Sequence, residues 1–242
     1  MNTKFMKTTL SLTILLMLIS ACGFLPTFGS RRLITEKRIV SGFTRVDVSG
    51  SGSLDIIQDG TEALSVETDD NMMPFVTSQV RAGTLYLALE SSMRSLAPSS
   101  LHFTLHVKNL GGINSSGSWQ VSSDSLKTGS LSIVISGSGK VVVKSLTVDY
   151  LDTSISGSGE LDLGGVVKQE TISVSGSGRV LLENLHATTA EVDISGSGSV
   201  TLWATETLTA RIDGSGNIKY YGSPRVSFNN SGSGSIHSLG EK

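Results

Sequence analysis

The sequence predicts an all-β protein: a single-stranded, right-handed parallel β-helix of about seven coils of about 20 residues each. Apolar residues alternate with polar ones along most of the chain, as in strands with one buried face. A short glycine-rich turn recurs at steps of 20, 19, 20, 18 and 18 residues. Repeats of this length stack on one another, because a single repeat cannot bury its apolar face alone. The turn is Ser-Gly-Ser-Gly, or once Asp-Gly-Ser-Gly, and begins at Ser136, Ser156, Ser175, Ser195, Asp213 and Ser231.

Each coil carries apolar residues at equivalent positions, which predicts continuous apolar columns inside the stack. A third apolar position is expected in the middle of the coil, at Leu146, Val166, Leu185 and Leu208. The inward pairs after the turns are Val141 and Val143, Leu161 and Leu163, Val180 and Leu182, Val200 and Leu202, and Ile218 and Tyr220.

The repeated turn has a structural explanation. Glycine adopts positive φ without steric cost, which a sharp corner requires, and serine hydroxyls bond local backbone groups. The outward residues after three of the turns, Lys140, Glu160 and Arg179, alternate in charge. Stacked in one column, they favour the correct register, although each exposed pair contributes only about 0–1 kcal/mol.

The N-terminus has the features of a bacterial export signal. Residues 1–21 have a basic start and an apolar run over 10–19, which is shorter than the roughly 20 residues that span a bilayer. The residues Ile19-Ser20-Ala21-Cys22 resemble the lipobox of bacterial lipoproteins, which implies lipidation of Cys22 after cleavage. With Gly23 rather than Asp after the cysteine, the resemblance to this class implies retention in the outer membrane and not the inner membrane. The alternative is an ordinary signal peptide followed by an inert thiol.

The remaining chain divides into a tether and one domain. Residues 22–38 lack periodicity and are expected to tether residues 39–242 to the lipid. Within that domain, 39–110 is an N-terminal β segment that caps one end of the stack, and 111–240 contains the repeat coils. Few residues remain to cover the other end, which predicts a charged tail or end-to-end self-association there.

The chain offers little catalytic or metal-binding chemistry. His102 and His106 are about 13 Å apart along one strand face, too far to chelate one ion. Glu160 and Asp162 lie on one outward face, where a solvated pair is favoured over a polysaccharide-cleaving acid pair. The glycine-rich turns match no phosphate-binding motif. With a formal net charge of −2 and no basic stripe, nucleic acid is not an expected partner. We therefore predict no catalytic residues, no metal and no cofactor.

The two tryptophans have different expected roles. Trp119 aligns with Leu54 of the first related turn and is expected in the core. Trp203 follows the inward Leu202 and is expected to point outward, so it is our candidate ligand-binding residue.

The motifs together resemble a known family. Gly112-Ile113-Asn114, the degenerate turn after it and the repeated Ser-Gly-Ser-Gly are similar to the putative autotransporter adhesin head domain called the GIN domain, which is common in lipoproteins of Bacteroidetes. The opening from Gly42 to Gly50 also looks like the start of that family, and the likeness spans roughly 40–238. The resemblance implies a β-helical fold and no established activity. Residues 107–110 depart from the family pattern, where a proline-containing step often precedes the Gly-Ile-Asn strand.

Three functions remain as hypotheses. The first is a non-enzymatic, lipid-anchored outer-membrane protein that binds an unknown envelope or extracellular polymer or protein through a stiff, flat, polar sheet. The second is a minimal polysaccharide-active β-helix enzyme. The third is a periplasmic scaffold in envelope-stress signalling. The sequence does not decide whether the domain faces the cell surface or the periplasm.

Overall fold

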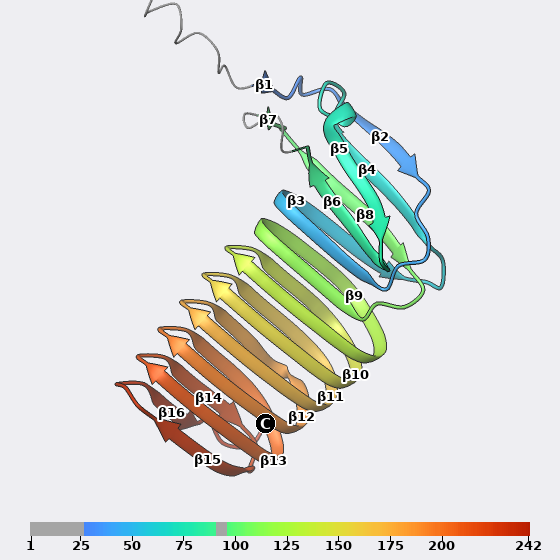
Figure 1. Cartoon of the computed structure of the whole chain (residues 1–242). Helices are drawn as coiled ribbons and strands as arrows, with labels where there is room; N and C mark the ends of the chain where they lie inside the picture. The colour runs from blue at the N-terminus through green and yellow to red at the C-terminus, as the bar shows by residue number, and fades with distance from the viewer. Residues whose placement is uncertain (1–26, 91–95) are drawn as a thin grey trace, which may run out of the picture.

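The protein is a β-solenoid with a smaller β assembly at its N-terminal end (Figure 1). The computed structural model describes residues 27–90 and 96–242. Within these ranges, no helix has the length and apolar character needed to span a membrane. The main sheet has the strand order β16-β14-β13-β12-β11-β10-β9-β3-β8-β4-β2, and β15 also pairs with β13.

The repeats form long bent strands that stack in parallel. Successive coils pair at offsets of 17 to 20 residues, for example Ser156 with Ser175 and Ser175 with Ser195. This pairing confirms the predicted parallel stack and excludes hairpins between successive repeats. The strands are β9 (Gly112–Gly137), β10 (Lys140–Gly157), β11 (Glu160–Gly176), β12 (Arg179–Gly196), β13 (Ser199–Gly214), β14 (Asn217–Tyr221), β15 (Arg225–Asn230) and β16 (Ser235–Ser238).

The glycine corners lie directly above one another. Gly157 has a φ of +115°, and a Cβ atom built on it would lie 2.7 Å from the carbonyl oxygen of Gly137. The same contact recurs one coil further on, between Gly176 and Gly157. The corner thus requires glycine for two reasons: the positive φ and the close approach of the neighbouring backbone.

The structure differs slightly from the expected seven right-handed coils. Corner glycines from Gly117 to Gly232 delimit six turns. The number of turns is lower than expected because the last part of the chain forms only the short strands β14, β15 and β16. The chain after β16 does not complete another corner.

The interior is a stack of apolar columns, with one local correction to the prediction. Leu146 and Leu185 are buried, but their partner in the coil between them is Gly165, and Val166 is 50% exposed. The register is shifted at this bend, so Val167 takes the buried position instead. Leu208 is buried too, although it pairs with Ala190 and not with Leu185.

The N-terminal segment caps one end of the solenoid, as predicted. Strand β3 (Arg45–Gln58) lies on β9 as the first layer of the stack. Its first half also pairs with β6 (Thr84–Leu89), and its second half pairs with β8 (Leu101–Val107). The sheet therefore divides at this end into two branches, which together cover the interior. The remaining elements are β1 (Thr27–Phe28), β2 (Leu33–Arg38), β4 (Ala63–Asp69), the short 3-10 helix η1 (Met73–Phe75), β5 (Val76–Arg81) and β7 (Leu96–Ala97).

Ordered structure begins earlier than the sequence analysis proposed. Residues 33–38, assigned to the tether, form strand β2, which pairs antiparallel with β4. The tether assignment is wrong for these residues. They contain no repeat and bury little side-chain surface, so the local pattern gave no strand signal.

Candidate functional site

The solenoid presents a regular surface on the outward side of the strand segment that precedes each corner. We call it the serine face. It has three columns of side chains, each with one residue per coil, and short polar residues predominate. The columns are Ser132, Asp152, Thr171, Glu191, Thr209 and Ser227; Val134, Ser154, Ser173, Asp193, Arg211 and Asn229; and Ser136, Ser156, Ser175, Ser195 and Asp213.

The serine face presents similar groups at a fixed spacing. Ser154 and Ser173 are neighbours on β10 and β11, and Ser156 and Ser175 lie beside them. Neighbouring strands are about 4.8 Å apart, so hydroxyl groups recur at that interval along the solenoid axis. Hydroxyl groups both donate and accept hydrogen bonds, so a repetitive polar partner can make the same contact on successive coils.

The serine face continues onto the N-terminal cap. Asp47 of β3 pairs with Asn114 on one side and with Tyr86 of β6 on the other, and Tyr86 pairs in turn with Gln79 of β5. The side chains of Tyr86 and Gln79 therefore extend one of the columns beyond the solenoid. Tyr86 is 43% exposed.

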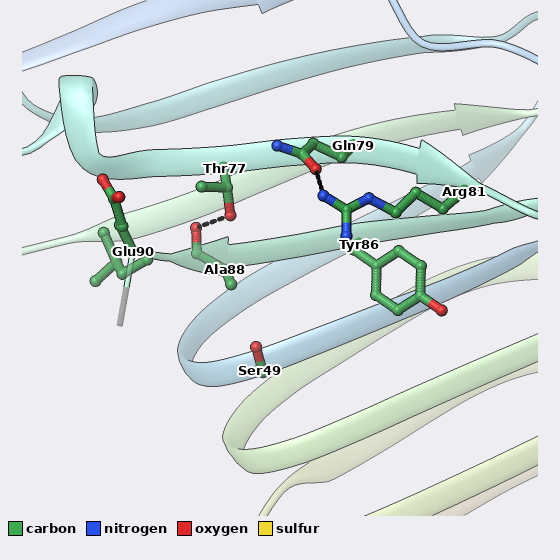
Figure 2. A pocket seen from close by; sticks show the side chains of 8 residues that line it. Ser49, Thr77, Gln79, Arg81, Tyr86, Ala88 and Glu90 are labelled. Carbon is green, nitrogen blue, oxygen red and sulfur yellow. Dashed lines mark hydrogen bonds between the residues drawn. The ribbon is translucent and has the colours of Figure 1, made fainter. Parts of the chain in front are cut away.

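A shallow groove lies at this N-terminal edge of the serine face (Figure 2). It has a volume of about 590 Å³. Arg81 extends along the hairpin and donates a hydrogen bond to the side-chain oxygen of Gln79, and the Tyr86 ring lies beside them. An exposed phenol ring next to guanidinium and amide groups can stack on one face of a ligand and hydrogen-bond its edge. The groove is lined by Ser49, Thr77, Gln79, Arg81, Tyr86, Ala88, Leu89 and Glu90.

Sequence reasoning missed this groove. The alternation Leu85-Tyr86-Leu87 does place Tyr86 on the polar side of its strand. What the sequence does not show is that β6 pairs with β3, which brings the ring next to the serine face.

The structure places Trp203 in an aromatic cluster at the bend between two strand segments. Its ring is half-buried and meets the ring of His186 edge-on, with 4.7 Å between the ring centroids. Tyr221 is its register partner on the next coil. The ammonium group of Lys242 lies over both the Trp203 and the Tyr221 rings.

A shorter coil explains this cluster. Leu182 pairs with Leu202, but the next pair is His186 with Trp203, so the later coil has no counterpart of residues 183–185. The omission brings Trp203 to the bend, directly beside His186.

The predicted charge column is present. Lys140 Nζ lies 2.8 Å from Glu160 Oε1, and Arg179 Nη1 lies 3.7 Å from Glu160 Oε2. Hydrogen bonding to Glu160 raises the pKa of Lys140. Glu160 is thus held between two cations in the register column where the sequence analysis placed it.

His102 belongs to a polar network on the outside of β3 and β8. Ser53 Oγ lies 2.8 Å from His102 Nδ1, and Asp55 Oδ2 lies 3.5 Å from His102 Nε2. These three residue types occur in hydrolytic triads. In this region, however, β3 is paired with β8 on one side and with β9 on the other, so its backbone N–H groups are engaged in the sheet and do not form an oxyanion hole.

Within residues 27–90 and 96–242, no group of three or more His, Cys, Asp or Glu side chains is arranged to hold a metal ion. The predicted lipidation residue, Cys22, lies outside the described residues.

The comparison with known families identifies the domain. Residues 42–224 match the model of the family described as "Putative auto-transporter adhesin, head GIN domain". The chain belongs to this family. The match covers the cap from β3 onward and nearly the whole solenoid.

Several solved structures share this fold. A putative adhesin from Bacteroides fragilis is 29% identical, with a TM-score of 0.84 over 88% of this chain and 100% of that chain. A protein from Parabacteroides distasonis described as a putative lipid binding protein is 27% identical, with a TM-score of 0.76 over 88% of this chain and 99% of that one. A putative adhesin from Parabacteroides merdae, 21% identical, shares the fold with a TM-score of 0.70 over 88% of this chain and 98% of that one. A search among curated proteins found no significant match.

Proposed function

We propose that this GIN-domain protein is a non-enzymatic adhesion module of the cell envelope that binds an extended polymer along its serine face. The observation that carries this proposal is the repetition of short polar side chains, mainly serine and threonine, in register from β9 to β15. A stiff surface of this kind contacts a repeating polymer at many weak points, and such contacts add up when both partners are regular. Membership of a family described as adhesins supports the same reading.

Two aromatic positions are proposed to add ring-stacking contacts. Tyr86 is the stronger candidate, because its ring is exposed beside the serine face and next to Arg81 (Figure 2). Trp203 is the second candidate, although Lys242 lies over its ring in this structure. Sugar rings present apolar faces that stack on such side chains, so a glycan is the polymer class we favour.

The proposed attachment is a lipid on Cys22 that holds the domain at the outer membrane. Metabolic labelling with an alkyne fatty acid, followed by conjugation to a fluorophore, should label the wild-type protein and leave Cys22→Ser unlabelled. Protease treatment of intact cells then reports the side of the membrane. Degradation supports a surface adhesin, whereas survival supports the periplasmic scaffold.

Binding is tested by incubating the purified chain, without residues 1–22, on arrays of envelope and host glycans and in pull-downs with insoluble polysaccharides. We expect retention by at least one glycan, weakened in Tyr86→Ala and less so in Trp203→Ala. If both variants bind every hit as the wild type does, the aromatic contacts are wrong.

The enzymatic alternative is tested on the same glycans. Release of reducing sugar by the wild-type chain would overturn the non-enzymatic reading. His102→Ala and Asp162→Asn would then show whether the His102 network or the acid pair is responsible.

A further inference from the structure

The first described residues of the chain are fixed to the outer edge of the cap. Strand β1 pairs in parallel with β7, and the backbone N–H of Gly29 donates a hydrogen bond to the Ala97 carbonyl oxygen at 3.0 Å. The side chain of Asn71 holds the same segment from the other side. Its Nδ2 donates to the Phe28 carbonyl oxygen at 3.0 Å, and its Oδ1 accepts from the Ser30 N–H at 2.9 Å. The path of residues 28–30 is therefore determined by the cap.

Asp69 completes this attachment from inside the cap. The residue is fully buried, and its carboxylate accepts hydrogen bonds from the backbone N–H groups of Arg31 and Ser99, each at 2.6 Å. Arg31 has a φ of +63°, a conformation that residues other than glycine rarely adopt unless the surroundings hold them there. The point at which the N-terminal segment joins the cap is thus built into the fold.

This edge of the cap lies close in sequence to Cys22. Four residues separate Cys22 from Thr27, so the two positions are at most about 17 Å apart even in a fully extended chain. The six turns of the solenoid, by contrast, extend over about 30 Å. Figure 1 shows β1 and β7 at the end of the molecule opposite β14, β15 and β16. A lipid on Cys22 would therefore hold the β1 edge close to a bilayer, while the last coils can lie far from it.

The exposed side chains at this edge suit a bilayer surface. Phe28 is 67% exposed and Leu33 is 47% exposed. Leu33 is the antiparallel register partner of Asp69, so both side chains point to the same side of the sheet, where Asp69 holds Arg31. Arg31 and Arg32 are exposed between the two apolar side chains. Apolar side chains enter the boundary between headgroups and acyl chains, and guanidinium groups bind lipid phosphates.

We propose that this edge docks on the surface of a phospholipid bilayer. We call Phe28, Arg31, Arg32 and Leu33 the anchor edge. The inference rests on the proposed lipid at Cys22 and adds a second contact to it, since stable membrane anchoring generally needs two such signals. Docking of the anchor edge sets the cap against the membrane. The coils from β10 to β15 are then presented away from the membrane, with the serine face accessible to a polymer.

The docking is tested with residues 22–242 coupled through Cys22, the only thiol, to a maleimide lipid in vesicles of phosphatidylcholine and phosphatidylglycerol. Phe28→Trp places a fluorescent probe on the anchor edge, and Ser227→Trp places one on β15. For Phe28→Trp alone, we expect the added fluorescence to shift to the blue and to be quenched by spin-labelled lipid. Absence of quenching in Phe28→Trp, or equal quenching of the two probes, would overturn the proposal.

A further substitution separates docking from tethering alone. In the Phe28→Trp chain, Leu33→Asp should lower the docking equilibrium constant at least about tenfold, as measured from the quenched fraction, because a charge replaces a buried apolar side chain. Val166→Asp is the matched control, since that valine is also half-exposed but lies on the side of the solenoid, and it should leave the quenching unchanged. Unchanged quenching in both variants would show that the tether alone holds the edge, which would overturn docking.

Failure of this inference is distinguishable from failure of the proposed attachment. The maleimide coupling supplies the lipid chemically, so the quenching does not depend on lipidation of Cys22 in the cell. A wild-type chain that takes up no alkyne fatty acid would refute the native attachment, whereas an unquenched Phe28→Trp probe refutes the docking of the anchor edge.

Discussion

The ammonium nitrogen of Lys242 lies 5.6 Å from the centroid of the Trp203 ring and 5.2 Å from that of Tyr221. The same group donates hydrogen bonds to the backbone oxygen of Glu183 and to Asn184 Oδ1, the latter at 2.9 Å. Leu239 is held to Tyr220 by a backbone hydrogen bond. The segment after β16 is thus fastened across the aromatic cluster that contains the candidate ligand residue.

Lys242→Ala should expose Trp203. Trp119 is buried, so a change in tryptophan fluorescence on this substitution reports mainly on Trp203. We expect a red shift of the emission and stronger quenching by acrylamide, with a loss of about 0.5–1 kcal/mol in the free energy of unfolding. Lys219→Ala, on the neighbouring strand β14, is the control and should change neither signal. An unchanged spectrum for Lys242→Ala would show that the lysine does not cover the ring in solution.

Glu170 is the one acidic residue of the described chain with both carboxyl oxygens buried and lacking a hydrogen-bond partner. It occupies an apolar column between Leu151 and Ala190, and burial raises its pKa to about 8 from the usual 4.5. Between these two pH values the folded chain keeps a proton that the unfolded chain releases. Stability therefore falls as pH rises across this window, by up to about 1.4 kcal/mol per pH unit.

Glu170→Leu should remove this pH-dependent loss of stability, because leucine already fills the same column at Leu131 and Leu151. We predict that the variant is more stable than the wild type at pH 8 by roughly a few kcal/mol. This difference in stability should shrink towards pH 5. Urea denaturation at several pH values measures both effects. Glu191→Leu, at an exposed position in the next coil, is the control. A wild type whose stability does not change between pH 5 and pH 8 would contradict the buried, protonated state of Glu170.

Gly157→Ala tests the stacked corners. Alanine would have to adopt a φ of +115° and bring its Cβ to 2.7 Å from the Gly137 carbonyl oxygen. We expect a loss of at least about 1–3 kcal/mol in the free energy of unfolding. Gly129→Ala is the matched control, because a Cβ there meets nothing within 4 Å, and it should be neutral or slightly stabilising. Thermal denaturation of the two variants side by side measures the difference, and equal midpoints would argue against the stacked corner.

The parts of this structure that repeat were predictable from sequence. Each corner requires glycine, and each coil requires apolar residues at fixed offsets, so the pattern from Ser136 to Ser231 indicates both the strands and their register. Val166 shows where prediction from the repeat pattern fails. A shift at the bend places Gly165 opposite Leu146, and no periodic rule shows which of two adjacent residues turns inward there.

The candidate site depends on contacts between distant segments, which the sequence pattern does not encode. Tyr86 reaches the serine face because β6 pairs with β3, about 40 residues earlier. Trp203 points outward as the alternation indicates, but its cover by Lys242 comes from the path of the tail across the preceding coils. The alternation of apolar and polar residues shows whether a side chain lies inside or outside the solenoid. It does not show which segment of the chain lies over that side chain.

The serine face itself is tested most directly by the affinity of the glycan or polymer that the wild-type chain retains best. The decisive variant is Ser154→Arg combined with Ser173→Glu, which sets a bulky ion pair on adjacent strands in the middle of the face. Its control is Val142→Arg, which sets a similar pair with Asp162 on another outward side of the same coils. In depletion isotherms, we predict that the double variant loses at least about tenfold in affinity while the control binds as the wild type does. Equal binding by all three proteins would contradict recognition through the serine face.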